Sequence, residues 1–143
     1  MDTYNSAVTY TTALVLPSWA PPAWLFWPVW SVLYIMIIIS YGAVVKTQII
    51  DPIRVGQGVT SANLLFILPF VINVIANILF TYFQFGLKNY SLALVDILIV
   101  LVTIIWTMYL LWSSHKILFR MQVPYLLWVG FATVLMWSVW RMN

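Results

Sequence analysis

The chain has 143 residues, of which 64% are hydrophobic and 6% are charged, and its formal net charge is +3. Soluble domains average about a quarter charged residues, so this composition excludes a soluble enzyme. The six Lys and Arg residues form no cluster that could follow a phosphate backbone, which argues against a nucleic-acid partner. The absence of cysteine excludes disulfides, thiolate catalysis and cysteine metal sites.

Residues 1–22 precede the first long apolar segment. Their one apolar stretch, residues 13–16, is too short to cross a bilayer, so we expect an interfacial segment. Pro17, Pro21 and Pro22 interrupt any helix here and indicate a Pro-rich loop, with a helix starting near Pro22.

Four apolar segments follow, each near the roughly 20 residues that a transmembrane helix needs. They are residues of about 24–45, 63–85, 91–112 and 123–140. Short polar connectors separate them, which favours an up-and-down arrangement. The predicted fold class is therefore an all-α integral membrane protein, in which residues 1–143 form a single antiparallel transmembrane helix bundle.

Aromatic residues recur at helical spacing within these segments. Trp30 and Tyr34 are four residues apart and share one face of a helix. Trp128 and Ala132 also share a face, and a large ring beside a small residue can shape a flat cavity. Ordinary packing between helices explains each of these pairs equally well, so both interpretations stay open.

The second segment carries a polar stripe formed by Asn73, Asn77, Phe80 and Gln84. Because an amide in hydrocarbon lacks water partners, we expect Asn77 to face the bundle interior. An interhelical hydrogen bond and a place at the rim of a pocket are compatible roles for it.

Asp96 lies inside the third segment, where a carboxylate is costly enough to suggest a functional site. It is also within two turns of the helix start, so capping or pairing near the interface is an equal alternative, with Lys88 and Asn77 as partners. The carboxylates are far apart in sequence and the chain has one histidine, so we predict neither a catalytic constellation nor a metal site.

Several motifs occur in the order typical of one membrane protein family. They are Pro17 to Trp30 followed by Leu33 and Tyr34, then Asn77, Phe85–Gly86 and Leu92 to Asp96, and finally Pro124–Tyr125, Trp128, Phe131 to Thr133, Leu135 and Trp140–Arg141. Together they resemble the TspO/translocator-protein family, the tryptophan-rich sensory proteins.

The resemblance implies a five-helix bundle, usually dimeric, whose cavity binds porphyrins, haem-like tetrapyrroles or sterols without a covalent cofactor. It also implies a bacterial inner membrane or a mitochondrial membrane, and some members are reported to promote light-dependent porphyrin breakdown. A role in sensing or transport follows. By resemblance, the ligand-binding residues are Pro21, Pro22 and Trp24 in a covering loop, and Trp30, Tyr34, Asn77, Phe80, Asp96, Trp128, Ala132 and Leu135 in the pocket.

The chain departs from the family pattern in two respects. Trp27, Phe80 and Met136 replace a usual glycine, tryptophan and asparagine. We also count four spans against five, and expect the family's first helix to be missing. An open side would favour a partner, so the alternative function is an accessory subunit of a larger membrane complex.

Overall fold

The computed structural model of the chain describes residues 17–142, and every regular element in that range is helical. The elements are α2 (Ala23–Val45), η1 (Lys46–Ile50), α3 (Asp51–Arg54), α4 (Ser61–Thr81), η2 (Tyr82–Gly86), α5 (Tyr90–Ser114) and α6 (Lys116–Met142). Both η1 and η2 are π-helical segments, and they continue α2 and α4. The expectations of an interfacial segment before Pro17 and of a missing first helix concern residues 1–16, which lie outside the described residues.

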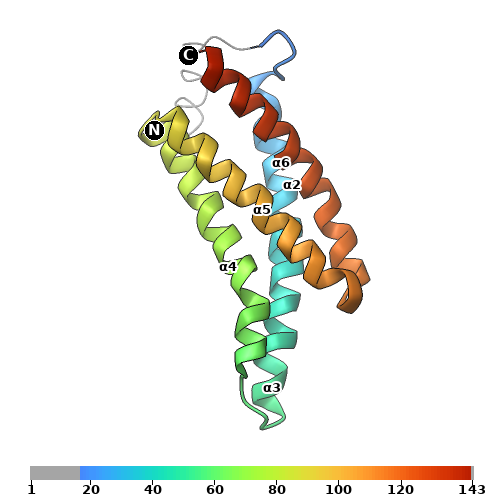
Figure 1. Cartoon of the computed structure of the whole chain (residues 1–143). Helices are drawn as coiled ribbons and strands as arrows, with labels where there is room; N and C mark the ends of the chain where they lie inside the picture. Colours follow the sequence, from blue (N-terminus) through green and yellow to red (C-terminus); the bar gives the residue numbers. More distant parts are fainter. Residues whose placement is uncertain (1–16, 143) are drawn as a thin grey trace.

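Helix α5 is the centre of the bundle. It packs along α4 on one side and α6 on the other, while α2 packs against α6 and touches α4 only sparingly (Figure 1). In the most apolar part of α5, half of the residues are buried, against 28% in the corresponding parts of Trp24–Arg54 and Ser61–Gln84. The described helices therefore form an arc in the order α4, α5, α6 and α2, which confirms the predicted antiparallel bundle.

Local sequence sets where the helices begin. At the start of α4, the backbone N–H of Thr60 donates to Asn63 Oδ1 at 3.0 Å, and the backbone N–H of Asn63 donates to Thr60 Oγ1 at 3.3 Å. This reciprocal pair satisfies two N–H groups at the helix start. At the start of α5, Asn89 Oδ1 accepts a hydrogen bond from the backbone N–H of Leu92 at 3.0 Å.

Two helices are longer than the apolar pattern predicts. The helical course of α2 continues through η1 and α3 to Arg54, and α6 begins at Lys116 instead of near residue 123. Polar residues ended the predicted spans, yet a helix can continue into the polar interface, where side chains reach water. His115 alone separates α5 from α6, and its backbone N–H still donates to the Leu111 carbonyl at 2.9 Å.

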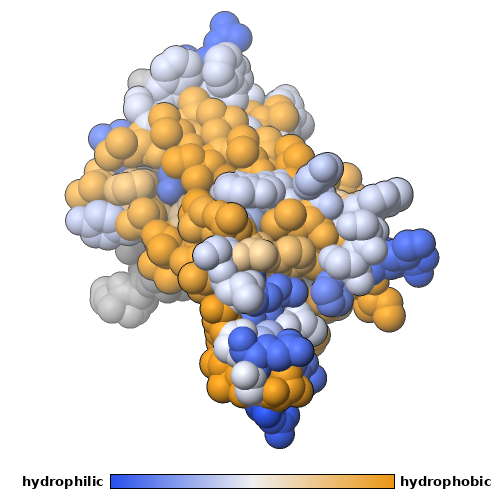
Figure 2. All heavy atoms as spheres, turned by 60° about the horizontal axis from the view of Figure 1, so that its bottom comes forward, coloured by the Kyte–Doolittle hydropathy of each residue, from blue (hydrophilic) through white to orange (hydrophobic). Residues whose placement is uncertain are grey.

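The surface is apolar over the length of the helices. Four helical stretches are long and apolar enough to cross a membrane, namely Trp24–Arg54, Ser61–Gln84, Tyr90–Ser114 and Lys116–Met142. Apolar residues cover broad areas of the face drawn in Figure 2, and strongly hydrophilic residues gather mainly at its projecting ends. Because water would penalise such a surface, the chain is a multi-pass integral membrane protein.

Hydrogen bonds that meet at Asn73 join all four long helices. The hydroxyls of Tyr41 on α2 and Tyr125 on α6 donate to Asn73 Oδ1 at 2.9 and 3.0 Å. The Asn73 amide donates to Thr103 Oγ1 on α5 at 2.9 Å. All four side chains are buried. We call the group formed by Tyr41, Asn73, Asn77, Thr103 and Tyr125 the Asn73 network.

A second polar contact fixes α2 against α6. The Gln122 side-chain amide donates to Ser40 Oγ at 2.8 Å, and Ser40 Oγ in turn donates to the Met36 carbonyl at 2.7 Å. Gln122 and Ser40 are both buried. Because hydrocarbon supplies no competing water, these bonds oppose sliding of α2 along α6.

Replacing Asn73 with leucine tests the Asn73 network. Asn73→Leu keeps the branched shape and the number of heavy atoms of the side chain but leaves the hydroxyls of Tyr41 and Tyr125 without their shared acceptor. Since each unsatisfied buried group costs about 1–3 kcal/mol, we expect the free energy of unfolding to fall by about 2 kcal/mol or more. Unfolding by SDS in mixed micelles, followed by circular dichroism, measures the change.

Thr133→Val is the matched control, because the Thr133 hydroxyl donates only within its own helix, to the Val129 carbonyl at 2.7 Å. We expect this substitution to change the free energy of unfolding by less than about 0.5 kcal/mol. Equal losses in the two variants would contradict the assigned role of Asn73.

Candidate functional site

Asn77 faces the bundle interior, as the polar stripe predicts. It lies one turn from Asn73 on α4, and its side-chain amide donates to the Tyr125 hydroxyl on α6 and to the Asn73 carbonyl. The side chain is 7% exposed. Asn77 therefore extends the Asn73 network toward the end of the bundle where the Pro-rich segment lies.

Asp96 is buried in α5 and is 3% exposed. Its Oδ2 atom has no hydrogen-bond partner among the described residues. Asn89 caps α5 through the Leu92 N–H, so Asp96 does not serve as the cap. The Asn77 amide donates to the Asn73 carbonyl and to the Tyr125 hydroxyl, and it does not pair with Asp96 Oδ2.

Aromatic rings converge on Trp128 of α6. The ring centroid of Phe26, on α2, lies 5.6 Å from that of Trp128 at an edge-to-face angle of 69°. Phe131 lies 5.6 Å from Trp128, and Trp19 of the Pro-rich segment lies 5.8 Å from Phe131. The rings of Trp19, Phe26, Trp128 and Phe131 are called the aromatic cluster below. It brings the Pro-rich segment, α2 and α6 together.

Within residues 17–142, five buried side-chain nitrogen or oxygen atoms have no hydrogen-bond partner. Besides Asp96 Oδ2, the buried side-chain atoms without a hydrogen bond are Trp128 Nε1, Gln84 Oε1, Gln122 Oε1 and His115 Nδ1. Trp128 Nε1 is a donor and Asp96 Oδ2 is an acceptor, and both belong to the residues predicted to bind a ligand. Buried polar groups without partners are costly in a protein interior, so a bound molecule that pairs them would be stabilised.

Trp30 and Tyr34 lie on one face of α2, as their spacing predicts. Their ring centroids are 5.5 Å apart with the planes tilted by 34°. Trp30 packs against the buried core, whereas Tyr34 is 42% exposed. Trp30 is therefore the more deeply packed of the two.

The other predicted ligand-binding residues divide into two groups. Phe80, Ala132 and Leu135 are half-buried and pack against the core. In the Pro-rich segment, Pro21 is half-buried and Pro22 is exposed, whereas Trp24 lies in the first turn of α2 and not in a loop, and is 65% exposed. Within this segment, Trp19 is the residue whose ring contacts the aromatic cluster, and the sequence motif alone did not single it out.

The sequence analysis also missed Tyr41, Tyr125 and Thr103 as partners of the amides. The available signal is a hydroxyl inside an apolar span, since such a group needs an interhelical or backbone acceptor. Pairing each hydroxyl with its partner requires knowing how the helices are rotated, which the pattern of one helix does not give.

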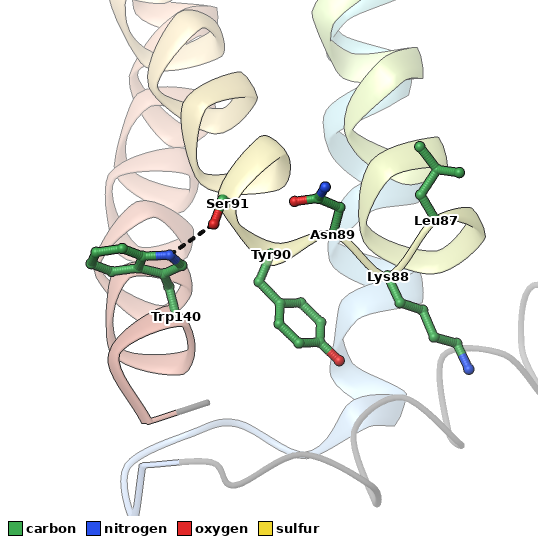
Figure 3. A pocket seen from close by; sticks show the side chains of 6 residues that line it. All are labelled: Leu87, Lys88, Asn89, Tyr90, Ser91 and Trp140. Carbon is green, nitrogen blue, oxygen red and sulfur yellow. Dashed lines mark hydrogen bonds between the residues drawn. The ribbon is translucent and has the colours of Figure 1, made fainter.

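An open hollow of about 510 Å³ lies where α4 turns into α5. Leu87, Lys88, Asn89, Tyr90, Ser91 and Trp140 line it (Figure 3). Trp140 Nε1 donates to Ser91 Oγ at 3.0 Å, while Lys88 points away from that pair. The hollow lies at the helix ends and contains none of the predicted ligand-binding residues. No group of three potential metal ligands occurs within the described residues.

Comparison with known proteins identifies the family of this chain. The model of the TspO/MBR family matches residues 1–141. The chain is 34% identical over 141 residues to the tryptophan-rich protein TspO of Chlorobaculum tepidum, covering 99% of this chain and 84% of that protein. Its identity to the tryptophan-rich protein TspO of Bacillus cereus is 33% over 135 residues, covering 94% and 81%. It is 28% identical over 140 residues to the human translocator protein, covering 98% and 78%. The chain therefore belongs to the TspO/MBR family.

Proposed function

We propose that the protein binds a flat hydrophobic molecule, a porphyrin-like tetrapyrrole or a sterol, between its helices, and that it serves in sensing or transport. The observation that carries the proposal is the aromatic cluster around Trp128, whose buried indole N–H lacks an acceptor within residues 17–142. Ligand sites combine apolar and aromatic walls with a few polar groups, and flat molecules stack on indole rings.

The position of the aromatic cluster supports this proposal. The Trp19 ring reaches Phe131 from the Pro-rich segment, and Phe26 reaches Trp128 from α2. Contacts between rings are weak individually, at about 0.5–1.5 kcal/mol beyond the apolar area they bury. A flat ligand could therefore replace some of them with its own ring contacts at small cost. The name of the human relative, translocator protein, agrees with a transport role.

Titration of the full chain in nanodiscs with protoporphyrin tests the proposal. We expect the porphyrin absorption band to shift on binding, and Trp128→Ala to weaken binding by about tenfold, because the ligand loses a large stacking surface. Trp112→Ala is the matched control, since Trp112 is 64% exposed and packs on Phe119, away from the aromatic cluster. An equal effect of the two substitutions, or none, would argue against this site.

A second candidate function is that of an accessory subunit in a larger membrane complex. It is favoured by the sparse contact between α2 and α4, the two helices at the ends of the arc. Two polar links join them: Tyr41 on α2 donates to Asn73 Oδ1 on α4 at 2.9 Å, and the Asn63 amide donates at 2.8 Å to Gln48 Oε1 of η1, which continues α2. A helix from another protein could lie between them only beyond Asn73, toward the Pro-rich segment, since Tyr41 also contacts the Phe70 ring of α4 at 4.8 Å.

Sizing of the native protein distinguishes the two candidates. After extraction in a mild detergent, the subunit hypothesis predicts co-migration with at least one other protein in stoichiometric amount. Mass photometry and native mass spectrometry report the assembly. A monomer or a simple homodimer would remove the subunit hypothesis and leave ligand binding in place.

A further inference from the structure

The Asp96 side chain lies within the α5 span and is 3% exposed. Its neighbours along the same face of α5, Ala93 and Val100, are fully buried. Its Oδ2 atom receives no hydrogen bond from the described residues. A carboxyl in such a position within a membrane span is costly, and a group of this kind normally has a partner.

Three donors of the described helices are already in use, whereas the Trp128 N–H is not. The Asn77 amide donates to Asn73 and Tyr125, and the Thr103 hydroxyl donates to backbone carbonyls of its own helix at 2.9 Å. Lys46 pairs with Asp51 at 3.2 Å in the connector at the other end of α2. A hydrogen-bond partner for Asp96 Oδ2 must therefore come from outside residues 17–142.

We propose that Asp96 accepts a hydrogen bond from the bound molecule, so that the buried end of the ligand is a neutral O–H or N–H donor and not a carboxylate. This inference rests on the proposed function, and it adds the polarity of the ligand to its shape. A hydroxyl or a ring N–H pairs with Oδ2, whereas the charge of a ligand carboxylate would be left without compensation in the apolar interior. Carboxylates of a tetrapyrrole would have to point away from Asp96.

The unpaired Trp128 N–H has the opposite polarity and adds a second requirement. It offers a donor to the ligand, so the same molecule needs an acceptor toward α6 or must present an aromatic face to the indole ring. Together the two residues favour a molecule that is apolar over most of its area and carries an uncharged polar group at one end.

A pair of sterols that differ in one atom group tests the inference. Dehydroergosterol carries a hydroxyl, and its 3-O-methyl ether has the same rings without the donor. Energy transfer from tryptophan to the sterol, measured with the full chain in nanodiscs, gives the two dissociation constants. Because the ether would leave a buried acceptor without a partner, we expect the alcohol to bind roughly tenfold more tightly than the ether.

Variants of Asp96 assign the preference to this residue. Asp96→Asn keeps an acceptor oxygen of the same shape and should retain a preference for the alcohol. Asp96→Leu removes the acceptor and should bind the alcohol and the ether within about twofold of each other. A preference that persists in Asp96→Leu would overturn the inference.

Results on the unmodified protein separate failure of the inference from failure of the proposed function. Equal binding of the alcohol and the ether would overturn the inference and leave ligand binding intact. If protoporphyrin binds and neither sterol does, the ring N–H is the predicted donor, and an unchanged porphyrin affinity in Asp96→Leu overturns the inference. If neither the sterols nor protoporphyrin bind, both the inference and the proposed function fail.

Discussion

The hydrogen bonds that meet at Asn73 are the constraint on which the rest of this bundle depends. Hydrocarbon offers no water to an amide or a phenol, so these groups must find one another inside the protein. One amide on α4 is bonded to side chains of Tyr41, Tyr125 and Thr103, which belong to the other three long helices. Apolar packing alone tolerates a sliding or rotated helix, whereas donors and acceptors at fixed distances do not. The network therefore sets the depth and rotation of α2, α4, α5 and α6 relative to one another.

With the helices fixed in this way, polar groups on the two sides of Asn77 differ in kind. On the side of Asn73, the hydroxyls and amides of the Asn73 network are paired with one another, although the Gln122 Oε1 atom of α6 is unpaired. Toward the Pro-rich segment, the Asp96 carboxyl and the Trp128 indole remain unpaired and lie among apolar and aromatic side chains. A protein that needed only a stable scaffold could replace both with apolar residues and gain stability. Their presence is the physical reason for placing a ligand at this level of the bundle.

Much of the fold could be predicted from the sequence, because each span is a long apolar run and the bilayer fixes its length. The helix ends could not, since polar residues such as those around Lys46 and Arg120 remain helical where they reach the interface. Periodicity placed Trp30 beside Tyr34 and turned Asn77 inward, because both follow from the geometry of one helix. It could not show that Asp96 Oδ2 lacks a partner within residues 17–142 or that Trp19 contacts Phe131, because both depend on how separate helices are rotated and where a loop returns.

The central claim is that the Asn73 network holds the helices so that Trp128 and Asp96 enclose a site for a flat molecule. An experimental density map of the protein prepared with protoporphyrin or a sterol tests it most directly. The account predicts a planar or elongated density between the helices, in contact with the Trp128 ring and with its polar group within hydrogen-bond distance of Asp96. Density only in the open hollow beside Lys88, or an interior filled by the protein's own side chains around Trp128 and Asp96, would contradict it.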